Sequence, residues 1–502
     1  MQYTQLSRRS AGGKIDWEKQ YLTFIPVENA VFKWTQNSVG GHLEYSINGG
    51  QTWVTIANGK STPTITAGSK VIWRGNLEPS SSYGIGTFSA SGNYNAYGNI
   101  MSLLYYDNYY NNQLDSTKHK YAFYNLFKSD THLLSAPELP ATTLADNCYY
   151  SMFSGCTSLI AAPKLPATTL ATSCYESMFD GCTSLVTAPE LLATTLADSC
   201  YDYMFNGCTS LTTVPELPAT TLANYCYANM FSSCTSLTTA PELPATTLAN
   251  KCYSSMFDSC TSLTTAPELP ATTLATSCYE YMFYGCTSLT TAPELPATTL
   301  ANYCYYSMFD GCKSLTTAPE LPATTLVFRC YHQMFRKCTS LVTAPELPAT
   351  ILAVDCYSVM FYGCTSLTTA PELPATTLAN YCYANMFNGC TSLTTAPELP
   401  ATTLANKCYS NMFNGCTSLV TAPELPATDL TGDNCYSRMF YGCTKLNYIK
   451  ALFKTTPSRM QTGEWVSGVA ATGIFVKNSA ATWETIGVDG IPTGWTVITN
   501  NS

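Results

Sequence analysis

The sequence predicts an α/β solenoid, a coil of short stacked units, and three observations predict it. The motif Cys-Tyr-x-x-Met-Phe-x-x-Cys occurs twelve times, first at Cys148–Cys156 and last at Cys435–Cys443. Corresponding cysteines recur with a period of about 26 residues from Cys148 to Cys408, a spacing typical of solenoid repeats. One extra residue precedes Cys435, and all 24 cysteines of the 502-residue chain lie in this motif. A unit of this size cannot bury its own apolar face, so it must stack on its neighbours.

Each repeat is expected to contain a strand, a turn and a short helix, as residues 235–260 illustrate. Residues 236–239 are β-rich, and the two prolines that follow end regular strand pairing. Leu248, Cys252 and Met256 are spaced i, i+4, i+8, which places them on one helical face. Nine of the twelve copies have Gly before the second Cys, which fits a left-handed residue at a helix C-terminus. About 12–13 such units form a leucine-rich-repeat-like right-handed coil.

The inward-facing residues of a repeat are its Leu, Met, Phe and Cys side chains. In the first copy the predicted structural core is Cys148, Met152, Phe153, Cys156, Leu159 and Leu165. Free Cys packs as a small hydrophobe, so buried free thiols are expected. Disulfides between stacked repeats are the alternative. A zinc site is disfavoured because the C-x7-C spacing has no regular His partner, so no metal or other cofactor is expected.

Regions without the motif flank the repeats, which predicts three domains. Residues 1–118 form a small β-sandwich-like attachment domain and connector, residues 119–450 the solenoid, and residues 451–502 a C-terminal cap with three tryptophans. The segment from Tyr45 to Trp53 is a hairpin signature, with Asn48-Gly49 at its turn. It resembles the Asp-box hairpin, which is a structural turn.

Composition excludes several classes of function. A net charge of −9 argues against nucleic acid as a partner, because phosphate binding needs a basic face. No apolar run has the length of a membrane span, so no membrane insertion is expected. The first 20 residues lack the apolar segment of a signal peptide, so synthesis and retention in the cytoplasm are expected. Four scattered His and no nucleophile motif indicate that the chain is not an enzyme.

Candidate binding residues lie at the positions that vary most between copies: the two before the first Cys, the two after the Tyr, and the two before the second Cys. Tyr, Asn, Ser and Asp predominate there, which is typical of an adaptable recognition surface. Drift of solvent-exposed positions is the alternative. The tyrosines singled out are Tyr225, Tyr284, Tyr303, Tyr362 and Tyr381.

One copy carries a basic cluster, formed by Arg329, His332, Arg336 and Lys337. It could dock an acidic sugar or a partner protein, or it could be a chance cluster.

Two rows of identical residues have competing interpretations. The Tyr after the first Cys occurs in all twelve copies, from Tyr149 to Tyr436. It either covers the helix edge with its hydroxyl in water or stacks on sugar rings. A Glu recurs in eleven of twelve repeats, from Glu138 to Glu424, with Lys164 in the other. The Glu side chains of that row either spread apart into solvent or contact a cation or a basic partner.

The combination of Leu-Thr-x-x-Pro with Met-Phe-x-Gly-Cys-Thr-Ser-Leu resembles the BspA-type leucine-rich repeat family of gut and oral bacteria and their phages. The tail from Trp465 to Trp495 resembles the ending of many such proteins. The resemblance covers about two thirds of the chain. This chain differs in having Met-Phe where the family more often has Ala-Phe, and in the close similarity of its copies. The resemblance implies adhesion or binding at a surface, without enzyme activity.

The function expected from these features is that of a phage virion appendage, a tail or head fibre or decoration that contacts a bacterial surface, a host protein or a mucosal glycan. The β domain would then attach to other virion proteins. An exported bacterial surface adhesin is the first alternative. A structural spacer in an assembly is the second.

Overall fold

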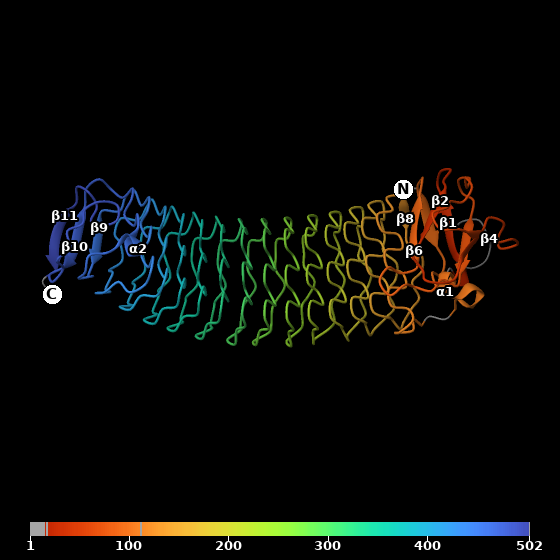
Figure 1. Ribbon diagram of the computed structural model, residues 1–502, viewed down its shortest axis with the longest axis horizontal. Helices are drawn as coiled ribbons and strands as arrows, with labels where there is room; N and C mark the ends of the chain where they lie inside the picture. Colours follow the sequence, from red (N-terminus) through yellow and green to blue (C-terminus); the bar gives the residue numbers. More distant parts are fainter. Residues whose placement is uncertain (1–15, 17–18, 111–112, 501–502) are drawn as a thin grey trace. The chain divides into compact units, whose positions relative to one another are not determined.

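The computed structural model describes residue 16 and residues 19–110 and 113–500. The chain consists of two compact units, Met1–Ala193 and Thr194–Ser502. Figure 1 shows strands near the N-terminus, successive turns through the repeats, and strands again near the C-terminus.

Two sheets form the N-terminal part of the first unit. The larger sheet has six strands in the order β4-β3-β5-β1-β7-β8, and the smaller sheet pairs β2 with β6. Every pairing in them is antiparallel except β7 with β8. The strands are β1 (Leu22–Pro26), β2 (Phe32–Gln36), β3 (Leu43–Ser46), β4 (Val54–Ile56), β5 (Val71–Gly75), β6 (Gly86–Ala90), β7 (Tyr94–Tyr97) and β8 (Leu133–Ser135).

Aromatic side chains fill the space between these two sheets. The Phe24 ring of β1 lies 5.2 Å from the Phe32 ring of β2 and 5.0 Å from the Phe88 ring of β6. Trp73 and Tyr94 complete the cluster around Phe24, at 5.5 Å and 5.0 Å. These rings pack β1, β5 and β7 of the larger sheet against β2 and β6 of the smaller sheet. A short helix α1 (Ser102–Tyr105) and a 3-10 turn η2 (Tyr106–Asn108) follow β7.

The predicted hairpin turn lies between β3 and β4. Asn48 Oδ1 accepts a hydrogen bond from the Thr52 N–H (3.0 Å), and its Nδ2 donates to Thr52 Oγ1 (2.8 Å). Gly49 and Gly50 have φ of 71° and 89°, a conformation that side-chain-bearing residues rarely adopt. This turn is structural, as expected from the Asp-box-like sequence.

The first repeat-like turn is joined directly to the β domain. The Phe88 N–H donates to the Leu126 carbonyl (2.8 Å), and β8 continues the large sheet. Asp130 occupies the place of the second Cys of later repeats and accepts a hydrogen bond from the Tyr94 hydroxyl (2.9 Å). Burial raises the pKa of the Asp130 carboxyl. On one side Asp130 contacts the β domain, where the Tyr94 hydroxyl donates to it, whereas the second Cys of a later repeat contacts another repeat on that side.

The helix predicted within each repeat is absent from the described residues, where the α-helices are α1 and α2 (Arg459–Thr462). Consecutive turns replace it. The Cys226 N–H donates to the Ala223 carbonyl in the same repeat (3.3 Å), whereas the Tyr227 N–H donates to the Cys252 carbonyl in the next (3.0 Å). Along this turn segment, successive N–H groups therefore bond alternately within the repeat and to the next repeat. The α/β part of the predicted fold class is therefore wrong, although the solenoid is present.

A left-handed residue at every fourth position produces these turns. In one repeat φ is 56° at Tyr225, 53° at Asn229 and 60° at Ser233. The backbone period is thus four residues, and two adjacent side chains of every four face inward, as Cys226 with Tyr227 and Met230 with Phe231. A four-residue spacing is close to the 3.6-residue period of a helix, so the same sequence pattern fits both structures. The Gly before the second Cys has the predicted left-handed conformation (Gly389, φ 75°), but no helix ends there.

Stacked side chains form the core of the repeats. In the second unit, the Tyr rings after the first Cys stack at centroid distances of 5.7–5.9 Å, and the Phe rings at 5.6–5.8 Å. All 24 cysteines are free and buried. The predicted core residues Cys148, Met152, Phe153, Cys156, Leu159 and Leu165 have exposed fractions of 0–4%.

The strand predicted at the Thr-rich edge of each repeat is reduced to isolated parallel bridges. Thr239, Thr265 and Thr291 illustrate them, each paired with its equivalent in the next repeat. The prolines that follow remove the donors that a longer ladder would need.

Parallel strands and a tryptophan close the C-terminal end. The sheet order is β11-β10-β9, formed by β9 (Tyr448–Ala451), β10 (Ile474–Asn478) and β11 (Thr496–Asn500). The fully buried Trp465 ring lies 6.5 Å from Tyr436 and 6.1 Å from Phe440, so it covers the last ring of both stacks. Its Nε1 donates to the Gly490 carbonyl (2.9 Å).

Candidate functional site: the variable face of the repeats

Four of the variable positions form one face of the repeats. Relative to the first Cys of a repeat they are positions −1, +2, +3 and +6, and we call them the variable face. Positions −1 and +3 have left-handed backbone, as at Tyr381 (φ 62°) and Asn385 (φ 55°). Large side chains at these positions reach the surface, as at Tyr381, whereas small ones such as Ser277 and Ser307 are covered by their neighbours.

A first hollow of about 430 Å³ lies on this face in the second unit, and we call it the Tyr281 hollow. Every residue that lines it occupies position +3 or +6: Ser255, Asp258, Tyr281, Tyr284, Asp310, Gln333 and Arg336. The Tyr281 and Tyr284 rings meet edge to face at 5.8 Å. A charged pair forms another part of the lining, since Arg336 Nη1 lies 2.9 Å from Asp310 Oδ2.

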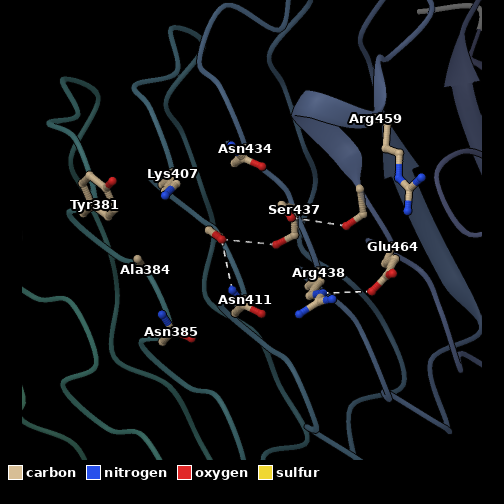
Figure 2. A pocket seen from close by; sticks show the side chains of 12 residues that line it. Tyr381, Ala384, Asn385, Lys407, Asn411, Asn434, Ser437, Arg438, Arg459 and Glu464 are labelled. Carbon is tan, nitrogen blue, oxygen red and sulfur yellow. Dashed lines mark hydrogen bonds and ion pairs between the residues drawn. The ribbon is translucent and has the colours of Figure 1, made fainter.

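A second hollow of about 480 Å³ lies nearer the C-terminus, and we call it the Lys407 hollow. Its lining is polar and follows four successive turns of the chain (Figure 2). Tyr381, Lys407 and Asn434 at position −1 form one side, and Asn385, Asn411 and Arg438 at position +3 form the other. Small residues at position +2 lie between them: Ala384, Ser410, Ser437 and the equivalent Gly463. Arg459 and Glu464, beyond the last repeat, complete the lining.

The tyrosines singled out from the sequence all lie on the variable face. Tyr225, Tyr284 and Tyr381 have exposed fractions of 41%, 37% and 38%, so their rings are available to a ligand. Tyr303 and Tyr362 are half-buried. Tyr284 lines the Tyr281 hollow and Tyr381 lines the Lys407 hollow. The sequence alone does not show which residues of other repeats lie beside these two tyrosines.

The basic cluster is not an open basic spot, which corrects the prediction for Arg329, His332 and Arg336. Arg329 Nη2 lies 3.1 Å from an Asp355 carboxylate oxygen, and Arg336 is paired with Asp310. Carboxylates of the neighbouring repeats therefore neutralise these two positive charges.

The remaining two members differ in exposure. His332 is 8% exposed and stacks on Tyr306 at 5.1 Å. Burial lowers the pKa of His332 to about 4, so its ring is neutral at pH 7. Lys337 is exposed.

The Tyr row is buried, which contradicts both interpretations of it. Tyr149 and Tyr253 have exposed fractions of 1%, as do their equivalents. The rings stack on each other in the core, so the hydroxyls do not lie in water and the faces cannot receive a sugar. Burial raises the pKa of these hydroxyls well above the usual value, as at Tyr253.

The Glu row is exposed from Glu190 to Glu424. Glu424 accepts a hydrogen bond from Lys450 Nζ at 2.9 Å. Within the described part of the chain, no group of three or more His, Cys, Asp or Glu side chains could hold a metal ion. In the same residues no helix has the length and apolar character needed to cross a bilayer.

Comparison with known families decides what kind of repeat this is. The model of the BspA type leucine-rich repeat region matches residues 119–264, 192–316, 250–385 and 329–457. These overlapping segments cover residues 119–457, more than half of the chain. The chain belongs to the BspA-type leucine-rich repeat family. Members of this family are surface adhesion or binding proteins, which agrees with a face of variable residues on an invariant core.

Two further comparisons add no detail. A similar solved structure is titled a crystal structure of a TLR13–ssRNA13 complex, with 12% sequence identity and a TM-score of 0.26. The alignment covers 73% of this chain and 53% of that chain, so this chain spans about half of its length. No curated protein matches the sequence.

Proposed function

We propose that this BspA-type repeat protein is a non-enzymatic adhesion protein whose variable face binds a bacterial surface, a host protein or a mucosal glycan. The observation that carries the proposal is the origin of the two hollows. All residues of the Tyr281 hollow, and all but Arg459, Gly463 and Glu464 of the Lys407 hollow, occupy variable positions of the repeats. These three lie after the final repeat, Arg459 at the start of α2 and Gly463 and Glu464 in the turn that follows it. If the exposed positions had only drifted, there would be no reason for the variable residues to line the two hollows.

The chemistry of these linings favours recognition over catalysis. They combine exposed Tyr rings, amides, hydroxyls and paired charges, which are the groups that adaptable binding surfaces use. The thiols are buried, and burial raises their pKa, as for Cys252 to about 12, so they are poor nucleophiles.

Binding of the purified chain to bacterial cells and to mucin tests the proposal. Tyr284→Ser and Tyr381→Ser introduce a residue that other copies already have at those positions, as at Ser232 and Ser277, so the fold is preserved. We expect at least one of them to weaken binding about tenfold or more, since exposed aromatic residues dominate binding surfaces. Thr290→Val, on the Thr-rich edge, copies Val342 and serves as the control. Loss of binding with Thr290→Val, and not with the Tyr variants, would refute the proposal.

Display on a phage virion is the second part of the proposal. Its support is the set of 24 free thiols, which suits assembly in a reducing cytoplasm. In this arrangement the β domain attaches to other virion proteins and the repeats face outward. Mass spectrometry of purified particles should detect the intact chain. Recovery from cell envelopes alone would instead assign it to an exported adhesin, and incorporation without any binding activity would assign it to a spacer.

A further inference from the structure

The Lys407 hollow runs along the stacking direction because position +2 is occupied by small residues in four successive turns. Ala384 and Ser410 have exposed fractions of 3% and 8%, so they form a floor below the flanking side chains. In some other repeats the same position carries larger residues, such as Tyr306 and His332, which stack on each other at 5.1 Å and fill the space, whereas Ala228 and Ser254 are also small. The longest run of small residues at this position thus lies in the last repeats, and its direction suits a linear ligand.

Side chains, not backbone, are available to a ligand in this hollow. The N–H groups of Tyr381, Lys407 and Asn411 donate to carbonyls of the following turn at 3.0, 2.8 and 2.8 Å. An extended peptide that pairs through its main chain would therefore find these donors occupied. Asn411 Nδ2 donates one hydrogen bond to Ser410 Oγ (3.1 Å), which leaves its second N–H for a ligand (Figure 2).

Once its ion pairs are counted, the hollow keeps one positive charge on an acidic protein, that of Lys407. Its lining contains Lys407, Arg438 and Arg459 against the single carboxylate of Glu464. Arg438 Nε lies 2.9 Å from Glu464 Oε2, and Arg459 lies near Asp489 at 3.9 Å. Lys407 forms no ion pair within the described part of the chain. Its ammonium lies 5.1 Å from the centroid of the Tyr381 ring.

We propose that the Lys407 hollow binds a linear saccharide that carries carboxylates, a polymer of uronic acid type. Lys407 contacts a carboxylate of the ligand, Tyr381 stacks on an apolar sugar face, and the Asn amides donate to sugar hydroxyls. This assignment rests on the proposed adhesion function and names the ligand class of one part of the variable face. The polar lining offers no apolar pocket for peptide side chains, which favours a saccharide over an acidic peptide.

The repeats contain a matched control for Lys407. Lys251 also occupies position −1, has φ of 54° against 53° at Lys407, and lies over a Tyr ring, 5.6 Å from the centroid of Tyr225. It lies outside both hollows. Lys407→Gln and Lys251→Gln therefore make the same chemical change in the same backbone setting, beside small residues at position +2 in both cases, but Arg438 and Arg459 line the surface only near Lys407.

Isothermal titration with hexagalacturonate measures the proposed binding, with maltohexaose as the neutral saccharide and hexaglutamate as the acidic peptide. We expect hexagalacturonate to bind, Lys407→Gln to weaken binding about tenfold, and Lys251→Gln to leave it unchanged. Added salt should weaken binding, because the interaction of exposed charges is screened. A second variant, Ser410→Tyr, copies the residue found at Tyr306 and should abolish binding by filling the floor.

Three results would overturn the assignment. They are equal affinity for maltohexaose, affinity for hexaglutamate that matches or exceeds that for hexagalacturonate, and equal loss in the two Lys variants. A chain that adheres to cells through Tyr284 but does not bind hexagalacturonate would refute this ligand and leave the adhesion function intact. A chain that binds neither cells nor saccharide would refute both.

Discussion

The thiol of Cys260 donates a hydrogen bond to the backbone carbonyl of Phe231, one repeat earlier, with an Sγ to O distance of 3.0 Å. That carbonyl also accepts the Cys234 N–H of its own repeat at 3.1 Å, so both of its lone pairs are used. Second cysteines from Cys286 to Cys443 repeat the contact at 3.0–3.1 Å. The second Cys is therefore a small apolar residue that also links adjacent repeats.

Replacement of Cys260 by Ala should destabilise the repeats more than replacement of a first Cys. Cys260→Ala loses the thiol hydrogen bond and leaves a small cavity, with an expected cost of about 1–2 kcal/mol in the free energy of unfolding. Cys304→Ala removes the same atoms, but the Cys304 thiol is 4.0 Å from the Cys330 carbonyl, so its cost should be smaller. Urea denaturation measures both, and equal losses would show that the thiol bond contributes nothing.

The thiols of the native protein should be unreactive. Burial raises the pKa of Cys252 to about 12, so almost no thiolate is present at neutral or mildly alkaline pH. A thiol-specific chromogenic reagent should detect none of the 24 cysteines in the native protein and all 24 after denaturation without reductant. A lower count after denaturation would reveal disulfides between repeats and contradict the free-thiol core.

Val359 should be a strained position whose replacement stabilises the chain. It has φ of 62°, a conformation that is costly for a β-branched residue, at position +3 of its repeat. Other copies have Asn there, as at Asn385 with φ of 55°. We expect Val359→Asn to raise the free energy of unfolding by about 1 kcal/mol and Asn385→Val to lower it by a similar amount. Thermal denaturation of both variants tests this, and a destabilised Val359→Asn would contradict it.

His332 should make stability depend on pH in the acidic range. Its pKa is about 4 in the folded chain, lowered first by burial, against about 6.5 when unfolded. Protonation therefore favours the unfolded chain. The stabilisation from the neutral ring is complete above about pH 6.5 and declines towards pH 4, by up to about 3 kcal/mol. Two charges act on its pKa in opposite directions, since Asp355 raises it and Arg329 lowers it.

His332→Tyr isolates this effect, because Tyr306 already occupies the same position one repeat earlier. The variant keeps the ring stack and lacks the titrating group. Denaturation at several pH values should give a smaller loss of stability on acidification for the variant than for the original chain. Parallel curves would indicate that other groups cause the pH dependence.

Trp465 should hold the last repeats in place. Trp465→Ala removes the ring that covers Tyr436 and Phe440, with an expected cost of about 3–5 kcal/mol. Trp465→Phe retains a ring over the stacks and loses the hydrogen bond to Gly490, so its cost should be nearer 1 kcal/mol. Amide hydrogen exchange should place the increased opening in the C-terminal repeats. Equal exchange in both variants would show that ring coverage is not the decisive contribution.

The repeat, its inward residues and the hairpin near Asn48 could be predicted from the sequence, because period and apolar pattern report directly on burial. The conformation of the repeat could not. Leu248, Cys252 and Met256 have a spacing that fits both a helix and a four-residue turn. The positive φ at Lys251 and Ser255 distinguishes the four-residue turn from the helix. Neither Lys nor Ser is a residue type that predicts a positive φ.

The candidate site was predictable only in part. Variation at Tyr284 and Tyr381 pointed to the face on which the two hollows lie. The pairing of Arg336 with Asp310, which lies one repeat earlier, depends on which side chains meet across a turn. The burial of the Tyr row was missed because a hydroxyl is usually placed in water, whereas stacking of identical rings kept these in the core.

By itself the sequence determined that twelve near-identical units stack and that their Cys, Met, Phe and Leu side chains face inward, since no single unit can bury them alone. The tertiary structure decided which turn the backbone makes, which charges neutralise each other, and where position +2 leaves a hollow. These outcomes depend on contacts between residues in different repeats. Neighbours along the chain do not specify them, because packing and electrostatics act through space.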